Sequence, residues 1–267
     1  MELLNANDVL TVKFKSEEFW FLAKIMGPGI LYGIENPTDK LTDKEQAKNN
    51  DIALDSLKKA GVLKINDENQ IILDKVLGAL FYCCLQADHV LIIKDISSNK
   101  SSLVYFKPQW QVELQQVEDY YIMNAIKDRN KLFDHIVDKY AIELQSSNNN
   151  DSFMIKENDL EFANSFYQNG EIEKALGILN KNRFPPSLRG DRFLEAFIKP
   201  EVWIKFQMIY DLNDKKNCRS RYFELFQFSE GLYWVSHLIA FNETYALLTY
   251  QAVTPEEAHF SFIDILP

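Results

Sequence analysis

LGALFYCCLQADHVLIIKDI, residues 77–96, is the most informative stretch of the chain, because it joins an apolar helical segment to a strand that ends in Asp95-Ile96. A similar stretch, LEAFIKPEVWIKFQMIYDL, occupies residues 194–212 and ends in Asp211-Leu212. Each stretch is followed by a polar turn, further strands and a helix. We therefore predict an α+β fold of two pseudo-twofold-related halves, with an antiparallel sheet flanked by helices. Any two helix–strand–strand–helix units share this order, so a chance likeness remains the alternative.

Outward from residues 77–96, the pattern of the first half predicts alternating strands and helices. Asp8–Lys15 alternates apolar and polar residues, which is typical of a strand, and Ser16 is placed to cap a helix. Thr42-x-x-Glu45 is a capping box, and the polar residues 66–69 between two apolar runs indicate a hairpin. The other elements expected here are a buried helix at 75–87, strands at 89–96, 103–107 and 111–117, and a helix at 118–140.

The second half begins after a polar segment, residues 146–152, which we interpret as a linker between an N-terminal α+β half, 1–145, and a C-terminal α+β half, 153–267. Thr254-Pro255 predicts the start of the last helix. The other expected elements are helices at 157–167, 171–179 and 191–198 and strands at 203–212, 221–228, 232–241 and 244–252.

Composition limits the classes of function. The 267 residues carry a net charge of −10, which disfavours binding to nucleic acid and suits either simple solubility or a basic partner. No apolar run reaches the length of a membrane-spanning helix, and the N-terminal residues do not have the pattern of a signal peptide. The 3 cysteines show no disulfide or metal spacing, so we expect Cys83 and Cys84 to be core residues and the compartment to be the cytoplasm.

The sequence lacks the common catalytic and ligand-binding motifs. The 4 histidines have no metal-ligand spacing, and no HExxH, CxxC, GxSxG, GxxxxGK[ST] or GxGxxG occurs. Cys218 lies beside Arg219, which favours a thiolate, but an incidental cysteine in a turn is the simpler interpretation. Residues 42–73 have the helix-and-hairpin order of a winged-helix DNA binder without its basic charge. We therefore expect no metal, no cofactor and no enzymatic activity.

The order of elements resembles the EspG-type chaperones of type VII secretion, and among their Gram-positive relatives the staphylococcal EsaE type. The similar features are the N-terminal strand leading into Glu18–Ala23, the leucine-containing helix and polar hairpin at 53–73, the buried helix followed by strands, and the closing helix before Leu266-Pro267. The polar linker and a helical insert at 159–180 depart from the family pattern. The resemblance implies a cytoplasmic chaperone that binds a helical secretion substrate, a toxin in our interpretation, and delivers it to the export machinery, with the secretion ATPase as a further partner.

Two hypotheses about function follow. The first is the secretion chaperone, and the second is an acidic, immunity-type inhibitor that binds the catalytic domain of a toxin. The strand Tyr222–Phe228 is apolar on both faces, so one face can line the core while the other contacts a partner. Phe226 on this strand and Trp234 on the strand candidate 232–241 lie in a region richer in aromatics than one core layer needs. We therefore predict both as partner-binding residues, and a core position is the alternative for each.

Overall fold

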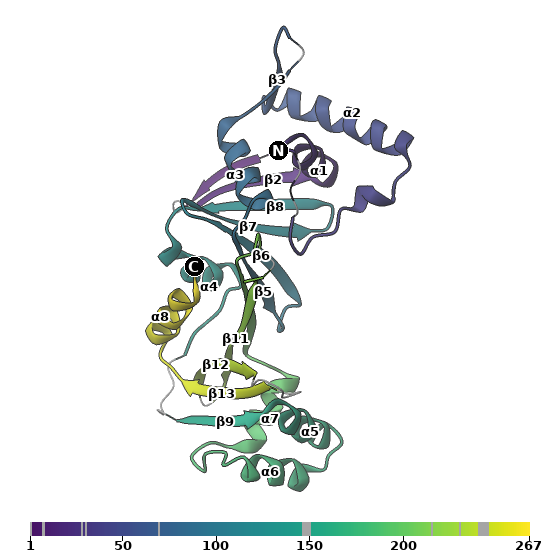
Figure 1. The fold of residues 1–267 in the computed structure, drawn as a ribbon. Helices are drawn as coiled ribbons and strands as arrows, with labels where there is room; N and C mark the ends of the chain where they lie inside the picture. The colour runs from purple at the N-terminus through teal and green to yellow at the C-terminus, as the bar shows by residue number, and fades with distance from the viewer. Residues whose placement is uncertain are drawn as a thin grey trace.

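An antiparallel sheet of 11 strands runs through the computed structural model (Figure 1). The structure describes the chain except residues 1, 7–8, 28, 30, 69, 146–150, 215, 230 and 240–245, with the backbone alone for 2–6 and 239. The strands are β1 Glu2–Ala6, β2 Val9–Lys15, β5 His89–Asp95, β6 Lys100–Lys107, β7 Trp110–Val117, β8 Tyr120–Ile126, β9 Ser152–Lys156, β10 Val202–Tyr210, β11 Arg219–Phe228, β12 Gly231–Ile239 and β13 Ala246–Ala252. A separate hairpin is made of β3 Leu63–Ile65 and β4 Ile71–Leu73.

The helices are placed symmetrically about this sheet. They are α1 Ser16–Ile25, α2 Asp43–Lys59, α3 Lys75–Leu85, α4 Leu132–Lys139, α5 Glu157–Gln168, α6 Ile172–Lys181, α7 Gly190–Ile198 and α8 Pro255–Ile265, with short 3-10 turns at Pro37–Lys40 and Arg129–Lys131. The strand order β2-β8-β7-β6-β5 in one half is mirrored by β9-β13-β12-β11-β10 in the other, and β5 pairs with β10 at the centre. The fold class predicted from the sequence is confirmed.

The mirrored order extends over more of the chain than the sequence indicated. Apart from β1 and the β3–β4 hairpin of the first half, each half runs strand, two helices, a third helix, four strands and a closing helix, so that α5 and α6 occupy the place that α1 and α2 hold in the first half. The segment 159–180, interpreted above as an insert, is therefore a regular part of the repeat. Helix α5 packs on the sheet with Leu160 and Ala163 buried, and α6 packs on α5 and α7 with Ala175 buried.

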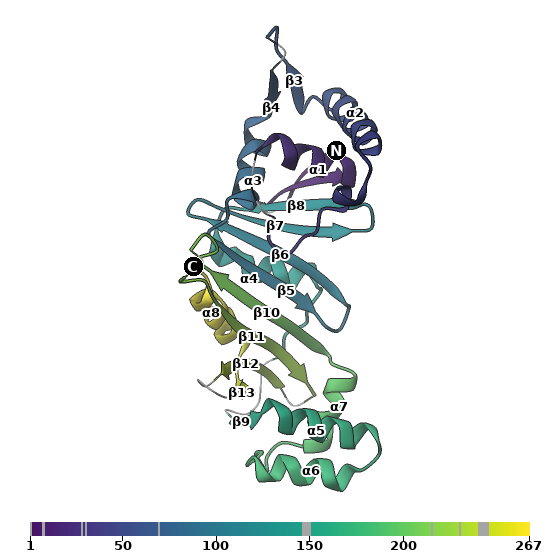
Figure 2. The same ribbon diagram turned by 45° about the vertical axis from the view of Figure 1, so that its right-hand side comes forward.

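Three apolar clusters hold helices against the sheet. One lies between α1–α3 and the first-half strands, and another lies between α5–α7 and the second-half strands. The third packs α4 and α8 against the middle of the sheet, on the side reached by Phe206 and Trp234. Because side chains alternate along a strand, Lys205 and Gln207 on either side of Phe206 lie on the opposite face. The helices therefore cover one face at its centre and the other face at its two ends (Figure 2).

The start of α2 is as predicted, and the start of α1 differs from the prediction by one residue. At α2, Thr42 and Glu45 form the reciprocal capping box that the sequence predicted. At α1 the cap is Lys15 rather than Ser16, because β2 continues to that residue. Glu18 accepts a hydrogen bond from the Lys15 backbone N–H at 2.9 Å and another from the Ser56 hydroxyl at 2.6 Å, and so also ties α1 to α2.

The helix predicted at 118–140 is wrong in its first part. Residues Tyr120–Ile126 form β8, which pairs with β7 on one side and with β2 on the other. Glu118 adopts a positive φ of 52°, which reverses the chain tightly between β7 and β8. Aromatic and β-branched residues follow, and their burial between two neighbouring strands outweighs a helical spacing of apolar positions. Only Leu132–Lys139 is helical, as α4, after a 3-10 turn.

The predicted linker, residues 146–152, lies mainly outside the described residues. Asp151 and Ser152 are described, and Ser152 begins β9, a short edge strand that the sequence analysis did not predict. The sheet is continuous across the two halves through β5 and β10, so the division at 145 and 153 separates two repeats of one sheet. Whether each half is a domain in its own right stays a prediction.

A buried carboxylate fastens α4 to the sheet. Glu113 on β7 has no exposed surface and accepts hydrogen bonds from His135 at 2.8 Å, from Asn124 at 2.8 Å and from Lys139. Burial alone raises the pKa of this carboxyl, but the hydrogen bond from His135 and the charge of Lys139 more than offset it and hold the pKa at about 2. Glu113 is therefore a charged group with full compensation inside the fold.

Acid should weaken this attachment. The pKa of Glu113 is lowered from 4.5 to about 2, so its interactions stabilise the fold above pH 4.5, and this stabilisation is lost as the pH falls toward 2. We expect the midpoint of thermal unfolding to fall through this window, and to fall less steeply in the variant Glu113→Gln, which cannot ionise. Equal slopes for the two proteins in a pH series of melts contradict this assignment.

Candidate protein-binding surface

The centre of one sheet face carries no helix. Figure 2 shows β5, β10 and β11 uncovered between α1–α3 and α5–α7, with α4 and α8 behind them. A cavity of about 400 Å³ lies here, and Glu157 and Ala246 line its edge. We call this surface the central strip, and its face is made by Ile92, Lys94, Lys205, Gln207, Tyr222, Glu224 and His237.

Glu224 organises the floor of the central strip. It is only 5% exposed, and it accepts hydrogen bonds from Trp203 Nε1 at 2.6 Å and from His237 Nε2 at 2.8 Å. Lys205 Nζ lies 3.3 Å from the same carboxylate and 4.7 Å from the centre of the Trp203 ring. Burial acts to raise the pKa of Glu224, but the His237 hydrogen bond and the Lys205 charge together lower it. Trp203, Lys205 and His237 thus hold the Glu224 carboxylate in a fixed position, with groups from three strands.

The rest of the strip offers mainly hydrogen-bond donors. Gln207 Nε2 donates to the Tyr222 hydroxyl at 2.8 Å, which leaves the Tyr222 proton free to face outward. Lys94 is exposed and lies directly opposite Lys205 in the register of β5 and β10. Ile92 and the 39%-exposed Tyr222 ring add apolar surface. An exposed aromatic ring beside several directed donors is suited to another protein's surface rather than to a small molecule.

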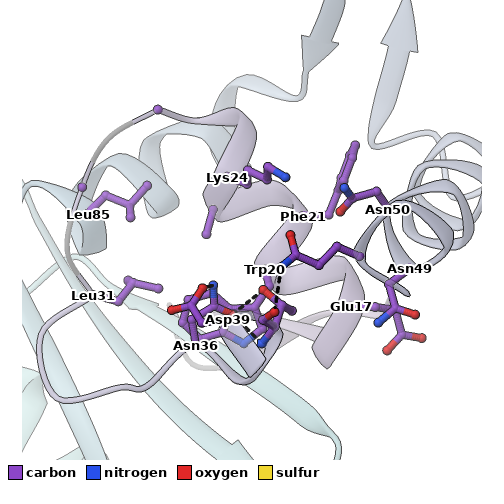
Figure 3. A pocket seen from close by; sticks show the side chains of 15 residues that line it. Glu17, Trp20, Phe21, Lys24, Leu31, Asn36, Asp39, Asn49, Asn50 and Leu85 are labelled. Atoms are coloured by element: carbon purple, nitrogen blue, oxygen red, sulfur yellow. Dashed lines mark hydrogen bonds between the residues drawn. The ribbon is translucent and has the colours of Figure 1, made fainter. Parts of the chain in front are cut away.

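A second pocket, of about 490 Å³, lies beside α1 (Figure 3). Trp20 and Leu31 form part of its apolar lining, and polar side chains surround its mouth. Several of these polar groups already serve the local fold: Asn36 Nδ2 donates to Asp39 at 2.8 Å, and Gln46 Nε2 donates to the Thr38 carbonyl at 3.0 Å. These hydrogen bonds hold the 3-10 turn beside α1 and α2, and the pocket is a consequence of that packing.

The two residues predicted as partner contacts lie in the core. Phe226 is 0% exposed and stacks on Phe197 of α7 with ring centres 4.9 Å apart, while Trp234 is 6% exposed and stacks on Phe206 at 6.0 Å. The strand Tyr222–Phe228 is apolar on both faces because helices cover both faces at that end of it. In this conformation neither side chain is available to a docked partner, so the alternative of a core position is the one that the structure supports.

The three cysteines lie in two kinds of environment. Cys83 and Cys84 are buried, as predicted, and burial raises the pKa of the Cys83 thiol to about 12. Cys218 is exposed in the turn before β11. Within the described part of the chain, no three His, Cys, Asp or Glu side chains are grouped as metal ligands. Among those same residues, no helix is long and apolar enough to cross a membrane.

The residues of the central strip were not predicted from the sequence. Glu224 was the available signal, since a glutamate in the middle of an otherwise apolar strand requires partners. Its partners lie on neighbouring strands, at positions set by a pairing register that the sequence does not state. Lys94 and Lys205 gave no signal, because each is one polar residue in an alternating strand.

Comparison with solved structures gives a match over nearly the whole chain. The fold is similar to that in the structure of the Mycobacterium tuberculosis type VII secretion system chaperone EspG5 in complex with the PE25–PPE41 dimer, with a TM-score of 0.63. The match covers 96% of this chain and 97% of EspG5, at 12% sequence identity. The chain has an EspG-like fold.

Sequence comparison adds nothing to this likeness. No family model matches the chain. No curated protein matches it either. The resemblance to EspG-type chaperones expected from the order of elements is thus supported at the level of the fold, and the EsaE type in particular stays a prediction.

Proposed function

We propose that the protein is a chaperone or adaptor of type VII secretion that binds a helical export substrate on the central strip and keeps it soluble for delivery. The observation that carries this proposal is the end-to-end likeness to EspG5, whose structure was solved in complex with a PE25–PPE41 dimer. The uncovered strip supports it, because its exposed aromatic ring and directed donors lie where a partner can reach them.

The kind of substrate, the further partner and the compartment are proposed from the resemblance to EspG-type chaperones. We propose a toxin as the substrate, the secretion ATPase as a further partner, and the cytoplasm as the place of action. Binding is proposed to need no metal and no cofactor, and the protein is proposed not to be an enzyme, since its buried charged groups are fully engaged with one another. The immunity-type inhibitor needs an acidic surface for a basic active site, and the lysines of the central strip do not favour it.

Co-expression tests this function. The chain is produced together with one helical type VII export substrate of its source organism at a time, and each mixture is separated by gel filtration. We expect at least one substrate that aggregates alone to co-elute with the chain as a soluble complex. Absence of co-elution for every such substrate contradicts the proposed function.

A matched pair of variants locates the binding surface. Tyr222→Ala removes the exposed aromatic ring of the central strip, and we expect it to weaken binding by about 2 kcal/mol, as for an interface hot spot. Phe260→Ala is the control, because Phe260 is a 69%-exposed aromatic on α8, on the other side of the sheet. Calorimetric affinities that fall equally for both variants, or only for Phe260→Ala, exclude the central strip as the site.

A further inference from the structure

We propose that Lys94 and Lys205 hold a carboxylate of the bound partner, so that the substrate helix docked on the central strip carries an acidic side chain at its centre. This inference rests on the proposed function and adds to it the chemistry by which the substrate is selected.

The pairing of β5 with β10 makes the two lysines neighbours. Lys94 on β5 and Lys205 on β10 are directly paired in register, and both lie on the uncovered face. Side chains at such positions have Cβ atoms about 5 Å apart, and like charges there destabilise a sheet. The pair is therefore a site of positive charge that a bridging anion relieves.

Among the residues that the structure describes, a counter-charge is found for Lys205 and not for Lys94. Lys205 lies against Glu224 and the Trp203 ring. Lys94 makes no ion pair with any residue that the structure describes, and the carboxylate of the adjacent Asp95 accepts from the Ser97 backbone N–H and the Ser98 hydroxyl. The exposed ammonium group of Lys94, beside the fixed ammonium group of Lys205, is therefore available to an acceptor of the partner.

Around Lys94 and Lys205, hydrogen-bond donors outnumber open acceptors. The carboxylate of Glu224 is used by Trp203, His237 and Lys205, and Glu157 accepts from the Ala246 backbone N–H at 3.3 Å. Tyr222 already accepts from Gln207, so its own proton is available. Gln207 Oε1 and the second oxygen of Glu157 remain open as acceptors, but the two ammonium groups and the Tyr222 hydroxyl together offer more donors, so the complementary partner group is an acceptor.

The overall charge decides between a single carboxylate and an acidic surface. With a net charge of −10, the chain repels a strongly acidic partner at long range. One carboxylate within an otherwise apolar helix face avoids this repulsion and still matches Lys94 and Lys205, while its apolar neighbours cover Ile92 and Tyr222. We therefore assign an apolar helix face with one central Asp or Glu as the ligand of the strip.

The test uses the purified complex of the full chain with the substrate that co-elutes in gel filtration. A water-soluble carbodiimide joins a carboxyl and an amine in direct contact as an amide with loss of water. Mass spectrometry of the digested complex is expected to show Lys94 or Lys205 linked to an Asp or Glu of the substrate. A complex that forms but gives no such link at either lysine overturns the carboxylate site and leaves the proposed function standing.

Charge reversal gives an independent readout. Lys94→Glu is expected to weaken binding at least tenfold and Lys94→Arg to change it little, because an arginine also neutralises a carboxylate. Lys48→Glu, at an exposed position on α2, is the control for a change in net charge. Replacing the linked substrate carboxylate by lysine is expected to restore binding to Lys94→Glu. Equal affinities for Lys94→Glu and Lys48→Glu overturn the proposal, and failure of every substrate to bind removes the proposed function together with it.

Discussion

Phe226→Ala is expected to destabilise the protein by about 3–5 kcal/mol, the cost of removing a fully buried aromatic ring from a packed core. The Phe226 ring contacts Phe197 and Phe193 of α7 and Trp203 of β10, with ring centres 4.9, 6.0 and 5.8 Å away. These neighbours belong to a helix and a strand that cannot both move in to fill the space, so a cavity should remain. Chemical denaturation of the free protein measures the loss directly.

The exposed Phe260 provides the control for this substitution. Phe260→Ala removes the same ring from a site that is 69% exposed, and its effect on the free energy of unfolding should stay within about 0.5 kcal/mol. If Phe226→Ala keeps the wild-type stability and loses a partner instead, the ring is a contact residue and the core assignment is wrong. Trp234→Ala, at a site 6% exposed, should behave like Phe226→Ala.

Much of the fold could be predicted from the sequence, because its signals are local. The capping box at Thr42 and the proline after Thr254 mark helix starts that the structure has at α2 and α8. The similar stretches 77–96 and 194–212 led to the two-halved sheet. The strand β8 was mistaken for a helix because its stability comes from two neighbouring strands that are remote in sequence, and β9 was missed because 5 residues at an edge leave little pattern.

The candidate surface could not be predicted in the same way. Aromatic residues in strands are equally suited to a core and to an interface, and only the positions of α7 and α8 bury Phe226 and Trp234. The central strip arises where two groups of helices stop short of each other, which is a property of helix placement rather than of any motif. Its lysines come together through the pairing of β5 with β10, where the two halves of the sheet join.

Lys139→Met is expected to destabilise the protein by about 3 kcal/mol, because it leaves the buried Glu113 carboxylate without its cationic partner. Methionine retains the length and apolar stem of lysine, so the change removes mainly the charge. His135 and Asn124 still donate to the carboxylate, which places the expected loss at the lower end of the range for breaking a buried ion pair. Urea denaturation at pH 7 measures it.

Arg192→Met is the matched control for this prediction. The ion pair of Arg192 with Glu195 lies on the surface of α7, with about half of each side chain exposed, and its loss should cost less than about 1 kcal/mol. The double variant Glu113→Gln with Lys139→Met should recover part of the stability lost in Lys139→Met, since a neutral amide no longer needs a counter-charge. If Lys139→Met is no worse than Arg192→Met, Glu113 reaches solvent or is protonated, and the buried charge does not hold α4 to the sheet.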